Sequence, residues 1–86
     1  MATEQDLAQL QAKKPVVGAK QLRKALHNRK ALQVFLARNA DPAITEPLVA
    51  LCERYGVQLF WVSSMKELGQ ACSIEVGASA AAVVMD

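Results

Sequence analysis

Residues 15–30 read PVVGAKQLRKALHNRK, and the rest of the chain can be organised around this stretch. It begins with a proline and two β-branched valines, which predict a short strand, and it turns at Gly18. From residue 19 to about residue 28 the apolar side chains recur at helical spacing, which predicts an amphipathic helix. The inner face of that helix consists of Leu22, Ala25 and Leu26. The opposite face is a basic stripe, with side chains at i, i+3, i+4 and i+7, made of Lys20, Arg23, Lys24 and His27.

The charge of the chain is unevenly distributed. Between Lys13 and Lys30 there are seven Lys or Arg residues and no acid. Residues 1–38 carry eight basic and two acidic side chains, or +6, whereas residues 39–86 carry two basic and six acidic ones, or −4. The net charge of +2 therefore conceals a strong asymmetry, and we expect a polyanion to meet the basic part first. The alternative is that the basic stripe is only a solvated helix face.

Length and composition predict one compact domain covering residues 1–86. Of the 86 residues, 52% are hydrophobic and 21% charged, which suits a single core. The opening MATEQDLAQL contains acids and no basic segment, and no apolar run approaches the about 20 residues that span a bilayer. We therefore expect a cytoplasmic protein that does not enter a membrane. Cys52 and Cys72 lack the spacing of a metal site, so we predict buried thiols rather than a disulfide.

Helices and strands are expected to alternate along the chain. The expected helices are 3–12, 19 to about 28, 45–55 and 65 to about 72, and the expected strands are 16–17, 32–37, 57–62 and 81–85. Asp41-Pro42 is interpreted as a turn, which places Pro47 in the first turn of the third helix. Gly56 is expected to end that helix, and Ser63 or Ser64 to cap the fourth.

The expected fold class is α/β, a three-layer α/β/α sandwich with a small mixed four-stranded sheet. LQVFLA (32–37) and VQLFWV (57–62) are apolar on both faces, as strands covered by helices on each side are. The order of the strands cannot be read from the pattern, although helical crossovers favour parallel neighbours. Phe60 and Trp61 fall within such a strand, so core packing is favoured over an RNA-stacking platform.

The chemistry-bearing residues do not form a catalytic pattern. His27 has no carboxylate at a spacing that would orient it, and the serines in VSSMKE lack the glycines of a nucleophile elbow. Gly18 begins a helix without the glycine pattern of a nucleotide-binding loop. We therefore expect neither an enzyme nor a cofactor or metal site.

Several segments resemble the kink-turn RNA-binding ribosomal protein family, which comprises the seven-Ae large-subunit protein and its short bacterial relatives. The likeness covers about residues 14–85. Its most specific parts are the Gly-led helix start, the ADP turn and the LGxACxIEVG segment. The matching segments are VVGAKQLRKAL (16–26), LQVFLARNADP (32–42), LCERYGVQLFWV (51–62) and MKELGQACSIEVGASAAAVVM (65–85).

The resemblance implies an α/β/α sandwich that binds kink-turn RNA, a sharply bent duplex with a three-nucleotide bulge beside tandem sheared G·A pairs. In the family, the helix start contacts the G·A pairs and phosphates, and a loop packs against a base turned out of the bulge. The RNA-binding residues implied here are Gly18, Ala19, Lys20, Gln21, Arg23, Lys24, Ile74, Glu75 and Val76. The implied protein is a bacterial, ribosome-associated monomer whose partner is ribosomal RNA or a structured mRNA leader.

The sequence also departs from the family pattern. Lys20-Gln21 stands where archaeal members have Asn-Glu, so an amide oxygen replaces a carboxylate acceptor. Ser73 and Gly77 differ from the usual glycine and proline, which predicts a differently stiffened loop. Two alternatives stay open. Ile74 and Val76 could simply pack beneath the next strand, and the protein could be a protein-interaction adaptor of the same fold with little RNA affinity.

Overall fold

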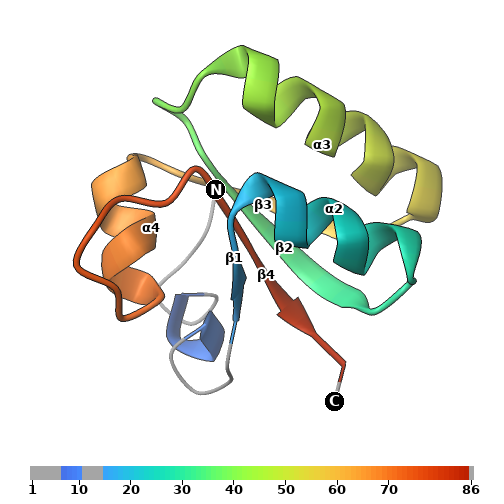
Figure 1. The fold of residues 1–86 in the computed structure, drawn as a ribbon, viewed down its shortest axis with the longest axis horizontal. Coiled ribbons are helices and arrows are strands. Elements are labelled where there is room, and N and C mark those ends of the chain that lie inside the picture. The colour runs from blue at the N-terminus through green and yellow to red at the C-terminus, as the bar shows by residue number, and fades with distance from the viewer. Residues whose placement is uncertain (1–6, 11–14, 86) are drawn as a thin grey trace.

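The computed structural model describes residues 7–10 and 15–85. It contains a four-stranded mixed sheet with helices on both faces (Figure 1), which confirms the predicted fold class. Residues 7–10 are helical, as predicted, while residues 3–6 and 11–12 of the same expected helix lie outside the described residues. The other elements are β1 (Val16–Val17), α2 (Ala19–His27), β2 (Ala31–Ala37), α3 (Pro42–Tyr55), β3 (Gln58–Val62), α4 (Met65–Ala71) and β4 (Ala80–Val84).

The sheet has the strand order β1-β4-β2-β3. Strands β2 and β3 are parallel, as the crossover through α3 predicts, but β4 is antiparallel to both β1 and β2. The sheet is therefore mixed, as predicted, although the parallel pairing that helical crossovers favour does not extend to β4. The chain after α4 explains why, because the Ala78 N–H donates to the Met65 carbonyl at the start of that helix. The loop thus runs back along α4 from its last residue to its first. As a result, β4 begins at the same edge of the sheet at which β3 ends, and it runs in the opposite direction.

The core has two parts, one on each face of the sheet. The α2/α3 cluster lies beneath α2 and α3 and includes Leu22, Leu26, Val34, Leu36, Leu48, Cys52, Ala80 and Ala82. The α4 cluster lies beneath α4 and residues 7–10 and includes Leu10, Phe35, Ala37, Leu68, Ala81 and Val83. Successive residues of β2 and β4 thus enter opposite clusters, because side chains alternate across a strand. This confirms that these strands are apolar on both faces.

Helix α3 begins one turn earlier than predicted, at Pro42. The Asp41 carboxylate accepts the Ala43 N–H at 2.9 Å, and proline is well suited to the first helical position because its fixed φ is already helical. The prediction was wrong because Asp-Pro serves equally as a turn and as a helix start. Pro47 consequently lies inside α3 and not in its first turn, where its missing N–H cannot donate to the preceding turn.

The remaining local predictions are largely confirmed. Gly56 ends α3 with φ 65°, a left-handed conformation that glycine adopts readily. Ser64, one of the two predicted caps, accepts the Glu67 N–H at 3.1 Å. Cys52 and Cys72 are free and buried, and burial raises the pKa of the Cys52 thiol to about 11, which keeps the thiol neutral.

The aromatic pair of β3 packs on opposite faces of the sheet, as predicted. Phe60 lies against the α4 cluster and stacks on Phe35 with ring centroids 5.3 Å apart. Trp61 lies against the α2/α3 cluster, and the Arg38 guanidinium stands 5.8 Å from the centre of its ring. Both rings are only partly buried, because β3 forms an edge of the sheet.

Candidate nucleic-acid interface

The start of α2 presents unpaired backbone amides. Gly18 precedes the helix with φ 103°, and no side chain caps its first turn. The Gly18 N–H donates to the Ala80 carbonyl at 2.9 Å, and the Leu22 N–H donates to the Gly18 carbonyl at 3.0 Å, as the first hydrogen bond of the helix. The amides of residues 19–21 therefore lack acceptors within the helix, and this end carries a partial positive charge.

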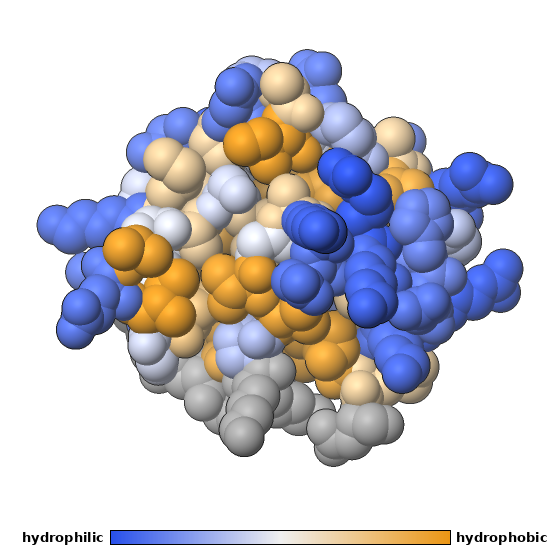
Figure 2. All heavy atoms as spheres, in the orientation of Figure 1, coloured by the Kyte–Doolittle hydropathy of each residue, from blue (hydrophilic) through white to orange (hydrophobic). Residues whose placement is uncertain are grey.

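The basic stripe lies along the exposed face of this helix. Lys20, Arg23, Lys24 and His27 are all exposed, and so is Gln21 beside them, whereas Leu22 and Leu26 are buried in the α2/α3 cluster. Hydrophilic side chains gather over α2 on the right of Figure 2, and apolar ones lie toward its centre and left. The sequence prediction of a two-faced helix is therefore confirmed, and its charged face is open to a ligand.

Residues 72–79 form the loop between α4 and β4, and its backbone is held directly against α4. The Ile74 N–H donates to the Gly69 carbonyl at 3.1 Å, which adds to the Ala78 bond to Met65. Gly69 allows this close approach, because a Cβ placed there would lie 2.1 Å from the Val76 carbonyl oxygen. Any larger residue at position 69 must therefore push the loop away from α4.

The predicted loop residues differ in their surroundings. Ile74 is partly buried and packs against the α4 cluster. Val76 is 71% exposed, the highest value among the exposed large hydrophobic side chains of the described residues. Glu75 between them is also exposed. Of the two aliphatic side chains, Val76 is thus the one that faces solvent, while Ile74 anchors the loop.

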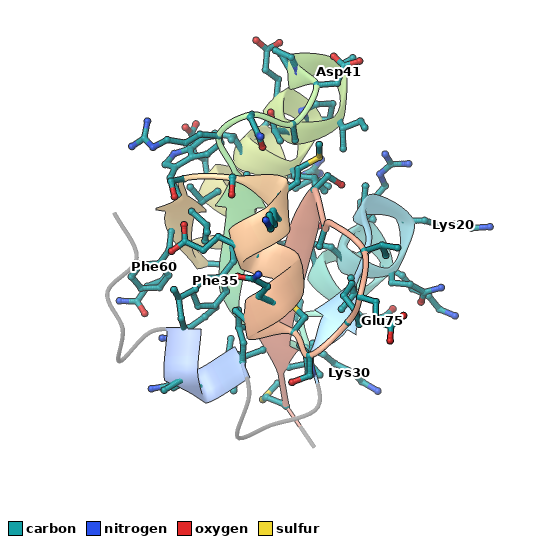
Figure 3. All side chains as sticks on the ribbon, turned by 90° about the vertical axis from the view of Figure 1, so that its left-hand side faces the viewer. Lys20, Lys30, Phe35, Asp41, Phe60 and Glu75 are labelled. Carbon is teal, nitrogen blue, oxygen red and sulfur yellow. The ribbon has the colours of Figure 1, made fainter. Side chains whose placement is uncertain are left out.

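The predicted site residues come from two segments that meet at the beginning of β4. The Gly18–Ala80 hydrogen bond joins the start of α2 to the end of the loop. Lys20 on α2 and Glu75 on the loop lie on the same side of the molecule in Figure 3. His27 stands apart at the other end of α2, where its Nδ1 lies 3.2 Å from the Tyr55 hydroxyl. The structure therefore places the end of the loop at the start of α2, and His27 at the other end of that helix.

Sequence reasoning missed Gly69, although a glycine inside a helical segment is a signal of close backbone approach. It also missed Arg29, Arg54 and Tyr55, because their proximity depends on how α2 and α3 pack. Within the described residues there is no group of three or more His, Cys, Asp or Glu side chains that could hold a metal ion. In the same part of the chain, no helix has the length and apolar character needed to cross a membrane.

The chain is similar to proteins that are already known. The chain matches the model of the "Ribosomal protein L7Ae/L30e/S12e/Gadd45 family" over residues 1–86. An "RNA-binding protein" of Geobacillus sp. (strain WCH70) is 47% identical over 75 residues, covering 87% of this chain and 92% of that protein. An "RNA-binding protein" of Bacillus pumilus (strain SAFR-032) is 43% identical with the same coverage.

A solved structure has the same fold. The "15.5kD RNA binding protein" of Giardia lamblia matches with a TM-score of 0.85 and 27% identity, covering 100% of this chain and 79% of that one. The resemblance that the sequence suggested is thereby confirmed. The chain belongs to the ribosomal protein L7Ae/L30e/S12e/Gadd45 family.

Proposed function

We propose that this protein binds structured RNA and recognises a kink-turn through the start of α2 and the loop of residues 72–79. The observation that carries the proposal is the junction at Gly18 and Ala80, whose 2.9 Å hydrogen bond joins an uncapped, basic helix start to a loop with an exposed aliphatic tip. The names of the relatives support RNA as the ligand. A kink-turn suits both parts, because it combines crowded phosphates with an unstacked base.

The helix start supplies charge and hydrogen bonds. The free amides after Gly18 donate to phosphate or base acceptors, and Lys24 and Arg23 neutralise phosphates. Lys20 and Gln21 stand next to these amides, at the positions that we assign to the sheared G·A pairs. The Gln21 side chain has both an amide donor group and an oxygen acceptor, which matches the mixed edges of such pairs.

The loop distinguishes kink-turn RNA from ordinary duplex RNA in this proposal. We assign Val76 to the base that turns out of the bulge, because its side chain is the exposed one. Ile74 supports it from below through its contact with the α4 cluster. Glu75 offers a carboxylate acceptor to base N–H groups. Ordinary duplex RNA has no unstacked base, so the loop contributes to binding only when the bulge is present.

The proposed protein is a non-catalytic, cytoplasmic monomer in which residues 1–86 act as a single RNA-binding domain. Its proposed partner is ribosomal RNA or a structured mRNA leader. The function rests on positioning and charge alone, since phosphate contacts and base contacts at one surface account for recognition without a chemical step.

A titration with two RNAs tests this function. One is a labelled kink-turn, and the other is the same duplex with its tandem G·A pairs converted to Watson–Crick pairs. We expect the kink-turn to bind much more tightly, and the affinity for both RNAs to fall as salt rises. Equal affinity for the two RNAs would exclude kink-turn recognition. Negligible binding of both at low salt would favour the protein-interaction adaptor.

A further inference from the structure

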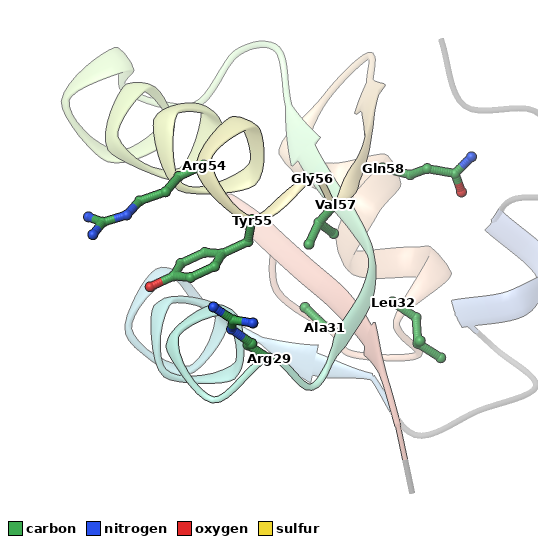
Figure 4. Close-up of a pocket in the computed structure, with 8 residues that line it drawn as sticks. All are labelled: Arg29, Ala31, Leu32, Arg54, Tyr55, Gly56, Val57 and Gln58. Atoms are coloured by element: carbon green, nitrogen blue, oxygen red, sulfur yellow. The ribbon is translucent and has the colours of Figure 1, made fainter.

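A second basic site lies at the opposite end of α2 from the proposed kink-turn contacts. It is a pocket of about 420 Å³ between the segment that follows α2, the last turn of α3 and the starts of β2 and β3 (Figure 4). A volume of this size falls within the range of small-ligand sites. Its lining contains two cationic side chains and no acidic one, and consists of Arg29, Ala31, Leu32, Arg54, Tyr55, Gly56, Val57 and Gln58.

Tyr55 organises the two arginines. The guanidinium carbons of Arg29, which follows α2, and of Arg54 in α3 each stand 5.8 Å from the centre of the Tyr55 ring, and Figure 4 shows the ring lying between them. The Tyr55 hydroxyl in turn lies 3.2 Å from His27 Nδ1. Contact with an aromatic face restricts a guanidinium without neutralising it, so both side chains keep their donors for another partner.

The arginines are not needed to cap the helices. At the end of α2 the Arg29 and Lys30 N–H groups donate to the carbonyls of Leu26 and Ala25. At the end of α3 the Gly56 and Val57 N–H groups donate to Glu53 and Cys52. The two helix ends carry partial charges of about −0.5 each, whereas two guanidinium groups carry +2, so the pocket keeps a net charge of about +1. This excess favours an anionic ligand.

The same pocket has an apolar part. Ala31 is buried, Val57 is partly buried, and Leu32 is an exposed large hydrophobic side chain at the start of β2. Two cations beside an apolar surface match a nucleotide, which combines a phosphate with a flat base. Binding of this kind tolerates different bases, because every base has a face that can stack.

Position connects this pocket to RNA. The basic stripe runs the length of α2, about 14 Å for nine residues, and ends beside Arg29. We propose that the pocket binds one unpaired nucleotide of the same RNA, with its phosphate bound by Arg54, with Arg29 supplying a second positive charge across the Tyr55 ring, and with its base against Val57. The inference rests on RNA binding by this protein but not on kink-turn recognition, because a single-stranded segment is sufficient to occupy the pocket.

The test uses the full chain, a minimal kink-turn RNA, and the same RNA with a six-uridine tail on either its 5′ or its 3′ strand end. We expect one tail to raise the affinity about fivefold or more, as a hydrogen bond between a guanidinium and a phosphate typically does. Arg54→Gln should abolish that gain and leave the affinity for the minimal RNA nearly unchanged. Lys66→Gln is the matched control, since it removes one exposed charge from α4 on the other face of the sheet.

Two further measurements show whether a change in affinity comes from the pocket itself or from a loss of stability. With 4-thiouridine in the tail, ultraviolet crosslinks should fall on peptides containing residues 29–32 or 54–58. The melting midpoint of Arg54→Gln should stay within a few degrees of the parent. The proposal is overturned if neither tail adds affinity, if Arg54→Gln weakens minimal and tailed RNA equally, or if this substitution lowers only the midpoint.

A competition experiment distinguishes a nucleotide that belongs to the RNA from a free mononucleotide. Uridine 5′-monophosphate should compete for the tail contact only weakly, because it lacks the neighbouring contacts along α2. Tight binding of this free nucleotide would overturn the RNA assignment in favour of a mononucleotide site. If the parent protein fails to discriminate kink-turn from plain duplex but still gains affinity from a uridine tail, the proposed function fails while this inference stands.

Discussion

The start of α2 and the loop of residues 72–79 contribute to the proposed RNA site by opposite means. The helix presents long, exposed, basic side chains whose positions follow from helical periodicity alone. The loop carries few charges, and its tip is placed by backbone contact with Gly69 and by the packing of Ile74. Exposed basic side chains such as those of α2 can each bind a phosphate independently. Binding of an unstacked base, by contrast, requires a loop whose backbone is held in one position.

Replacing Gly69 by alanine should have the largest effect, because it acts on the support of the whole loop. The new Cβ would meet the Val76 carbonyl oxygen at 2.1 Å, so the loop must move. We expect the free energy of unfolding to fall by about 1–3 kcal/mol, as for other overpacked sites. We also expect kink-turn affinity to fall by up to about a hundredfold, which corresponds to the loss of one buried aliphatic contact.

Thermal unfolding and the two-RNA titration measure both effects of Gly69→Ala. Gly56→Ala provides the control, since φ 65° strains an alanine by about 1–2 kcal/mol although no atom lies within 4 Å of the new Cβ. This control should lower the melting midpoint and keep discrimination between kink-turn and plain duplex. Unaltered discrimination in Gly69→Ala would contradict the role that we assign to the loop.

Two substitutions in the loop, Val76→Asp and Ile74→Asp, should have different effects. We expect Val76 to contact the RNA base and Ile74 to support the loop. Because Val76 is exposed, its substitution should leave the melting midpoint nearly unchanged and lower kink-turn affinity by about 1–3 kcal/mol, with little effect on plain duplex. Because Ile74 packs against the α4 cluster, its substitution should lower the midpoint and affect both properties. Equal stability losses in the two variants would remove this distinction.

Lys24→Gln tests the helix side of the comparison and should have a moderate, unselective effect. Neutralising one phosphate contact should reduce the slope of log affinity against log salt by about 0.7–0.9, and weaken binding at low salt by about fivefold. Kink-turn and plain duplex should lose affinity alike, because both offer phosphates. Lys66→Gln on α4 serves as the control and should change neither the slope nor the affinity. A selective loss of kink-turn binding would instead show that Lys24 contacts a feature that only the kink-turn has.

Gln21→Glu should have the smallest effect. A carboxylate makes a hydrogen bond to guanine N–H groups about twice as strong as the bond from an amide oxygen. Repulsion from nearby phosphates opposes this gain, and Lys20 and Lys24 offset the repulsion in part. We expect discrimination for the kink-turn to rise by less than about fivefold, measured as the ratio of the two affinities at one salt concentration. A fall in that ratio would place Gln21 away from the G·A pairs.

The elements that the sequence predicted well are those with a strong local signal. The apolar run of β2 and the two-faced pattern of α2 lie within one residue of their predicted bounds. The start of α3 was wrong because Asp41-Pro42 has the chemistry of both a turn and a helix cap. The direction of β4 was missed because it depends on a loop that folds back along α4, and no residue of β4 itself encodes that path.

The candidate site divides in the same way. The basic stripe could be predicted because four side chains on one helix face require nothing beyond helical spacing. The separate roles of Ile74 and Val76 could not, because alternation along an irregular loop does not say which side meets the core. The pocket at Arg29, Arg54 and Tyr55 was also out of reach, since it joins residues 25 or more positions apart at the ends of two helices.

The approximate positions of most described helices and strands, the double-sided sheet and the charged face of α2 could be predicted from the sequence, because periodicity and turn chemistry act within a few residues. Only the tertiary structure decided the antiparallel entry of β4, the contact of Gly69 with the loop and the meeting of that loop with Gly18. These features depend on backbone groups of distant segments coming within hydrogen-bonding or van der Waals distance. Such distances follow from how the helices pack on the two faces of the sheet, and local pattern carries no information about them.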